Sequence, residues 1–160
     1  KAAQTGHMVL STLHTNDAPT TLTRMMNMGI PTFNIASSVI LITAQRLARR
    51  LCPTCKVHLD APRKALLDAG YKADELDGSW TPYKPVGCSA CNNGYKGRVG
   101  IYQVMPITEE IQRIILKGGS ALDIAQQSMR EGVRTLRESG LLKVKQGVTS
   151  LEEVLSVTNE

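Results

Sequence analysis

Two tetrapeptides, Cys52-Pro53-Thr54-Cys55 and Cys88-Ser89-Ala90-Cys91, decide how this chain folds. In each of them two residues separate the cysteines, so one turn of backbone can aim both sulfurs at a single point. Together they supply four thiolates, the ligand set that tetrahedral Zn²⁺ prefers. The chain has four cysteines in all, so no thiol is left over. The sequence therefore predicts a structural zinc site, because four sulfur ligands leave no open position for a reacting water.

A pair of disulfides is the rival interpretation of the same cysteines. Disulfides need an oxidising compartment, and nothing in the sequence resembles a secretory signal. We therefore expect reduced, metal-bound thiols. Residues 56–87, between the two cysteine pairs, form a longer span than that of a usual zinc ribbon, which predicts a zinc-closed subdomain rather than a compact finger.

The composition allows one ordinary domain or two small ones in 160 residues. No apolar run approaches the roughly 20 residues of a membrane span, so we expect none. Lys and Arg number 19 against 14 Asp and Glu, and many of the cations surround the first cysteine pair: Arg46, Arg49, Arg50, Lys56, Arg63 and Lys64. A four-thiolate zinc centre has a net charge of about −2, which neighbouring cations stabilise. Nucleic-acid binding is the alternative, but one Trp, four Tyr and one Phe leave little for base stacking.

The first half of the chain predicts a mixed α/β fold. The apolar run 7–14 suits a short buried strand, followed by a helix with Asp17 as N-cap, Pro19 in its first turn and Gly29 as its stop. A second helix is expected over 34–44. Residues 45–51 and the alternating run 98–104 read as strands next to the cysteine pairs, so a metal would join the ends of two paired strands.

Between the cysteine pairs we expect a short helix over 62–69 and a Pro/Gly-rich loop over 78–85. From Thr108 onward the sequence predicts helices with clear start and stop signals. Helix starts are marked by Thr108, Ser120-x-x-Asp123, Thr135-x-x-Glu138 and Ser150-x-x-Glu153. The second of these helices should carry Leu122, Ala125 and Met129 on its apolar face. We expect these helices to form a small C-terminal bundle.

Polar side chains crowd the end of the first predicted strand, over Ser11-Thr12-Leu13-His14-Thr15-Asn16-Asp17. In open α/β sheets, ligands lie beyond the carboxyl ends of the strands and near helix N-termini. A histidine there could sense or stabilise a phosphate. A loop histidine with only local hydrogen bonds is the alternative, and position alone does not choose between them.

Several motifs together resemble one family. Residues 5–18 resemble the His box of the secretion ATPases, which drive type II secretion and type IV pilus assembly. Gln45-Arg46-Leu47, Arg50-Leu51-Cys52, the two C-x-x-C pairs and Gly94-Tyr95-x-Gly97-Arg98-x-Gly100-Ile101-Tyr102 also resemble that family's motifs, in the same order. The resemblance covers almost the whole chain and is closest to the pilus-extension (PilB-type) branch. The retraction motors of the superfamily lack the cysteine subdomain.

The resemblance implies specific roles. His7 and His14 match the two His-box histidines and would be catalytic, with Thr12 and His14 near the nucleotide. Cys52, Cys55, Cys88 and Cys91 match the zinc ligands. The family's members are cytoplasmic hexamers at the inner membrane that turn ATP hydrolysis into motion of a membrane platform protein.

The same resemblance divides the chain into part of a RecA-like core (1–51), a zinc subdomain with a return strand (52–104) and a helical region (105–160). The chain has no G-x-x-x-x-G-K-[ST] loop and no acidic Mg²⁺ strand, which lie upstream in the family. We therefore expect a fragment of a longer ATPase that is inactive alone. Alternatives are a type II secretion ATPase, a zinc-ribbon nucleic-acid module and a non-catalytic adaptor.

Overall fold

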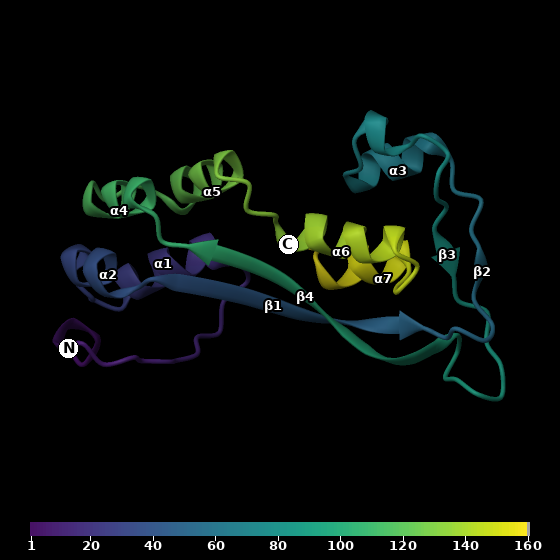
Figure 1. Ribbon diagram of the computed structural model, residues 1–160, viewed down its shortest axis with the longest axis horizontal. Helices are drawn as coiled ribbons and strands as arrows, with labels where there is room; N and C mark the ends of the chain where they lie inside the picture. Colours follow the sequence, from purple (N-terminus) through teal and green to yellow (C-terminus); the bar gives the residue numbers. More distant parts are fainter. Residues whose placement is uncertain (160) are drawn as a thin grey trace. The chain divides into compact units, whose positions relative to one another are not determined.

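The computed structural model describes residues 1–159, which form two compact units. One unit consists of Lys1–Ala44 and Gln103–Thr135, and the other of Gln45–Tyr102 and the chain from Leu136 onward. The chain contains both helices and strands, so it is a mixed α/β protein (Figure 1). The elements are η1 (Ala3–Thr5), α1 (Ala18–Asn27), α2 (Thr32–Ser38), β1 (Leu41–Leu51), β2 (Val57–His58), α3 (Arg63–Ala69), η2 (Ala73–Glu75), β3 (Tyr83–Lys84), β4 (Tyr95–Pro106), α4 (Glu109–Leu116), α5 (Ala121–Arg130), α6 (Leu136–Lys145) and α7 (Leu151–Val157).

Two long strands, β1 and β4, are hydrogen-bonded neighbours and run in opposite directions (Figure 1). Side chains on successive residues of a strand point to opposite faces, and β4 follows this rule, with Ile101, Gln103 and Met105 buried and the residues between them exposed. The strands predicted over 45–51 and 98–104 are therefore confirmed. Both are longer than expected, and each runs through both units.

The first unit is held together by four helices, with α1 packed on α5 and α2 packed on α4. Asp17 caps α1 by accepting a hydrogen bond from the Thr20 N–H at 2.8 Å, as predicted, and Pro19 lies in the first turn. The N–H of Ala18 donates to the buried Gln103 side chain at 3.0 Å, which ties the start of α1 to β4. The core of this unit consists of Leu22, Ile35, Met105, Ile111, Ile115 and Ile124.

The second unit packs α6 and α7 together. Gly140 lies in the middle of α6, where an added Cβ would be 2.6 Å from Val154 Cγ1 and 3.2 Å from Ile101 Cδ1. The absence of a side chain therefore lets α6, α7 and β4 approach closely. The helix predicted between the cysteine pairs is present as α3, and buried Tyr71 just after it donates to the Leu141 carbonyl at 2.6 Å. In the expected loop, β3 pairs antiparallel with β2.

Three sequence-based expectations are wrong. Residues 7–14 form no strand, and Met8 and Leu10 are 87% and 90% exposed. A strand needs a neighbouring backbone for its hydrogen bonds, and none of the strands in residues 1–159 pairs with this segment. The second helix ends at Ser38 rather than residue 44, because the backbone turns extended at Val39 and Leu41–Ala44 join β1.

The third wrong expectation is the single C-terminal bundle. Helices α4 and α5 belong to the first unit, whereas α6 and α7 belong to the second. Within α5 the buried side chains are Ile124 and Ser128, and Leu122 and Met129 are exposed. The Ser128 hydroxyl contacts the Met105 sulfur at 3.0 Å, so packing against β4 decides which face is buried. The functional division at residues 51 and 104 stays a prediction.

No helix within residues 1–159 combines the length and the apolar character that crossing a bilayer requires.

Candidate metal centre

The four cysteines converge where β1 ends and β4 begins. Their sulfurs all lie within 4.8 Å of one another. Cys52 Sγ is 3.8 Å from Cys88 Sγ, Cys55 Sγ is 3.7 Å from Cys91 Sγ, and Cys88 Sγ is 3.6 Å from Cys91 Sγ. Sulfurs bound about 2.3 Å from a tetrahedral zinc lie about 3.8 Å apart, so these separations fit one ion.

Local backbone structure produces this convergence. Cys52 directly follows β1, and its N–H donates to the Gly94 carbonyl at 2.9 Å, which joins the two cysteine pairs across the strands. Asn93 and Gly94 both have positive φ, 52° and 90°, and turn the chain back into β4. At Gly94 an added Cβ would be 2.8 Å from Pro85 Cα. Glycine is therefore required there both for its conformation and for close approach of the loop.

The sulfurs accept backbone hydrogen bonds, as thiolates do. Cys55 Sγ accepts from the Gly87 N–H at 3.4 Å, and Cys91 Sγ accepts from the Cys88 N–H at 3.3 Å. These donors orient the sulfurs towards a common point and stabilise negative charge on them.

Burial, backbone hydrogen bonds and the neighbouring thiols shift the pKa values of Cys52 and Cys88. Burial raises the pKa of Cys52, but hydrogen bonds from the Thr54 and Cys55 backbone offset it, and the pKa falls to about 6. The Ala90 N–H lowers the pKa of Cys88, but contacts with Cys91 and burial raise it to about 11. Several thiolates this close repel one another, and a bound cation removes that repulsion.

All four cysteines are free thiols in this structure, so the disulfide interpretation is wrong. Cys88 Sγ and Cys91 Sγ, for example, lie 3.6 Å apart, whereas a disulfide bond measures about 2.05 Å. The four cysteines are therefore close enough to bind a metal ion. If all four coordinate it, a tetrahedral ion has no free position, which suits a structural metal.

Several contacts hold the metal centre against α6 and α7, and we call them the brace. They were not predicted from the sequence. Glu153 Oε1 accepts from the backbone N–H of Arg49 at 3.0 Å, and Oε2 accepts from Arg49 Nε and Nη2 at 3.1 and 2.8 Å. Arg49 also lies over the Tyr95 ring, 4.1 Å from its centroid. The Tyr95 hydroxyl lies 2.7 Å from the Ser150 hydroxyl.

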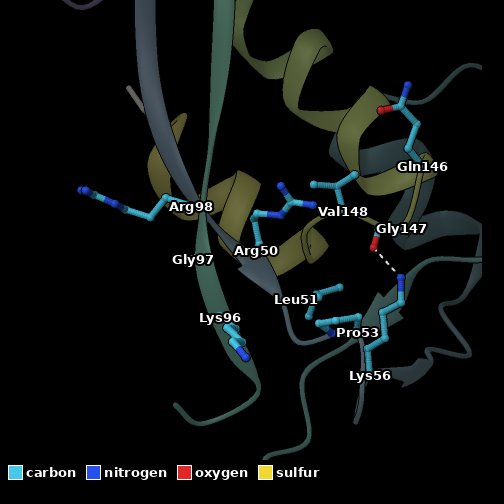
Figure 2. A pocket seen from close by; sticks show the side chains of 10 residues that line it. All are labelled: Arg50, Leu51, Pro53, Lys56, Lys96, Gly97, Arg98, Gln146, Gly147 and Val148. Atoms are coloured by element: carbon cyan, nitrogen blue, oxygen red, sulfur yellow. Dashed lines mark hydrogen bonds between the residues drawn. The ribbon is translucent and has the colours of Figure 1, made fainter. Parts of the chain in front are cut away.

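The same brace continues at the loop between α6 and α7. Lys56 Nζ, one residue after the first cysteine pair, donates to the Gly147 carbonyl at 2.8 Å (Figure 2). The Leu51 N–H donates to the Val148 carbonyl at 2.9 Å. A partial signal for the brace was present, because Ser150-x-x-Glu153 has the pattern of a capping box. The Ser150 hydroxyl does cap α7, but the Glu153 carboxylate bonds to Arg49 instead of returning to Ser150.

The His-box residues lie in the first unit. His7 and His14 are both exposed, as is Thr12, in a segment without regular structure. His7 Nδ1 is 3.1 Å from the Thr5 hydroxyl. None of the three lines the pocket beside the metal centre in the second unit, and their roles at a nucleotide stay a prediction.

The chain belongs to the type II/IV secretion system protein family, whose sequence profile matches residues 1–156. It is 58% identical over 160 residues to the type IV pilus assembly ATPase PilB of Pseudomonas aeruginosa, and 51% identical over 160 residues to PilB of Myxococcus xanthus. It is 42% identical over 161 residues to type II secretion system protein E of Aeromonas hydrophila. These alignments cover 99% of this chain or more, but only 28%, 28% and 31% of the three relatives. The chain therefore spans less than a third of the length of these relatives.

Proposed function

We propose that this chain is part of a longer protein that hydrolyses ATP to power type IV pilus assembly. The observation that carries the proposal is the family match over residues 1–156, combined with 58% and 51% identity to two pilus assembly ATPases. The type II secretion relative shares fewer residues, 42%, so secretion is the second candidate.

The proposed architecture follows from the resemblance. The intact protein would be a cytoplasmic homo-hexamer at the inner membrane that acts on a platform protein, with residues 1–51 in a RecA-like core. The exposed apolar segment around Met8 and Leu10 supports this assignment, because such side chains gain about 1.5–3 kcal/mol each when a neighbouring part of the protein covers them.

Zinc is the proposed metal, in a purely structural role. Four thiolates at tetrahedral spacing fit Zn²⁺ better than an oxygen-binding cation such as Mg²⁺. The ion would hold the end of β1 next to the start of β4. The ion pair between Arg49 and Glu153 would in turn hold α7 against β1.

In the proposed reaction, phosphoryl transfer from ATP to water depends on positioning and electrostatics. ATP and Mg²⁺ would be held mainly by upstream motifs that this chain lacks, so the 160 residues alone would be inactive. His14 would report or stabilise the γ-phosphate, with Thr12 beside the nucleotide and His7 supporting the same segment.

The test uses the intact protein and the variant His14→Ala. We expect ATP turnover to fall at least about 100-fold, a typical contribution of a group acting in the transition state, with nucleotide affinity changed by less than about twofold. His58→Ala, an exposed histidine on β2, is the matched control and should keep the wild-type rate. An unchanged rate for His14→Ala removes the role of His14, whereas an inactive wild-type protein removes the ATPase proposal itself.

Pilus assembly and type II secretion are separated by complementation. The intact protein should restore pili to a strain whose pilus assembly ATPase has been deleted. Restoring secretion in a strain without its type II secretion ATPase, but not pili, would favour the second candidate.

A further inference from the structure

A cationic pocket lies beside the metal centre, within the second unit. Its volume is about 580 Å³, and its walls come from the end of β1, the first cysteine pair, the start of β4 and the loop between α6 and α7. The side chains that matter here are Arg50, Lys56, Lys96, Arg98 and Gln146 (Figure 2). Among residues 1–159, none of those that line this pocket is acidic.

The pocket holds a large share of the positive charge of the chain. Lys and Arg exceed Asp and Glu by five over the whole sequence, and four of the cations lie around this one pocket. Three of these cationic side chains are unpaired within residues 1–159. The side chains of Arg50, Lys96 and Arg98 form no ion pair and no hydrogen bond within residues 1–159.

The Arg50 and Lys56 side chains reach the pocket from different sides (Figure 2). Arg50 extends from β1 towards Val148, and Lys56 points at the Gly147 carbonyl from the opposite side of the pocket (Figure 2). A Cβ at Gly97 would be 3.8 Å from Arg50 Cδ, an ordinary van der Waals distance, so the arginine stem lies against β4. Arg98 points away from the other cations in this view.

We propose that this pocket binds a phosphate-bearing anion. A phosphate group has up to two negative charges in a small volume, and the Arg50 fork can bond two of its oxygens at once while the Lys side chains act as point charges. The pocket has the volume of a small-ligand site, which a headgroup or a free phosphate compound enters. Free phosphate compounds and anionic lipid headgroups have this chemistry in common.

The first experiment locates the site in the 160-residue chain by titrating inorganic phosphate at constant ionic strength and following backbone amide signals by NMR. We expect the signals of Gly97 and Gly147, which line the pocket, to shift in a saturable way. Arg50→Gln and Lys96→Gln should each weaken binding about fivefold, and Arg98→Gln less. Lys117→Gln, an exposed cation after α4, removes the same charge elsewhere and should leave binding within about 1.5-fold.

The second experiment distinguishes the source of the phosphate. Co-sedimentation with phosphatidylcholine vesicles containing 30% phosphatidylglycerol, roughly the anionic content that attracts basic proteins, is compared with pure phosphatidylcholine. Vesicle binding that Arg50→Gln weakens but Lys117→Gln does not would identify a lipid headgroup. Saturable binding of phosphate without vesicle binding would identify a free compound.

Three results would overturn the proposal. One is the absence of any saturable shift and of any vesicle binding. Another is equal weakening by Arg50→Gln and Lys117→Gln, which would mean diffuse electrostatic attraction. The last is saturable binding of a poly-glutamate peptide at Gly97 and Gly147 without binding of phosphate or vesicles, which would make the pocket a site for an acidic protein segment.

Discussion

The contact between Arg49 and Glu153 should contribute measurably to the stability of the second unit, and replacing Glu153 tests this. The Glu153 side chain is 8% exposed and accepts three hydrogen bonds from Arg49, whose side chain is 57% exposed. Because the guanidinium is largely in water, its ion pair is worth only about 0.2–1 kcal/mol. The backbone N–H of Arg49 would lose its carboxylate acceptor, at a cost of about 1–3 kcal/mol.

Glu153→Ala should therefore lower the free energy of unfolding by about 1–4 kcal/mol, which corresponds to a decrease in Tm of roughly 2–16 °C for a domain of this size. The assay is urea unfolding followed by the fluorescence of Trp80, the only Trp of the chain, which lies in the same unit. Arg49→Met keeps the backbone N–H and should cost less, about 1–2 kcal/mol, including the lost contact with the Tyr95 ring.

Glu152→Ala, at the exposed neighbouring position in the first turn of α7, is the control and should stay within about 0.5 kcal/mol of the wild type. The reasoning fails if Arg49→Met destabilises the protein as much as Glu153→Ala does, or if Glu152→Ala does.

The stabilisation by Glu153 should also depend on pH. Burial raises the pKa of Glu153, but the Arg49 hydrogen bonds outweigh it and hold this pKa below its ordinary value of 4.5.

A carboxyl whose pKa is depressed on folding stabilises the folded state above its unfolded pKa and loses that contribution as pH falls through the folded pKa. The difference between wild type and Glu153→Gln should accordingly be constant from pH 7 down to about 5, and should shrink below pH 4.5. A difference that grows on acidification would contradict the sign of this argument.

Other substitutions test the metal centre and its packing. Cys88→Ser should reduce bound zinc from one ion per chain to well below one, as measured by mass spectrometry of the native protein. In the wild type, a strong chelator should increase hydrogen exchange over residues 52–91. A metal-free chain with unchanged exchange would remove the structural role of the metal. Gly94→Ala should lower zinc occupancy or the midpoint of unfolding, because its Cβ would overlap Pro85; a stabilised variant would show that the loop moves freely. Gly140→Ala should destabilise by about 1–3 kcal/mol in urea unfolding, despite the better helix propensity of Ala, because the Cβ meets Val154; a gain of stability would show that α7 shifts at no cost.

Local signals in the sequence predicted much of this structure. Asp17, Thr108 and Ser120 cap the helices that follow them, since an N-cap acts on backbone only two or three residues away. The alternation of side chains around Ile101 predicted β4, because side-chain direction in a strand also depends only on adjacent residues. Spacing also brought Cys52 and Cys55 together, because both sulfurs lie on one turn.

Interactions between distant residues were beyond such reasoning. Residues 7–14 have the composition of a strand, but pairing is decided by whether another strand is adjacent. The apolar spacing predicted a helix through Ala44, but residues 41–44 belong to β1, which is hydrogen-bonded to β4. The brace at Glu153 could not be found from a local pattern, because its partner is more than 100 residues away.

By itself, then, the sequence determined where most helices begin and that four thiols come in two pairs, because those features depend on neighbouring residues. Only the tertiary structure decided that the two pairs meet, that the C-terminal helices divide between two units, and that Arg50, Lys56 and Lys96 surround one pocket. The physical reason is that burial and charge act over distances in space, and the chain brings together residues whose separation in sequence carries no local signal.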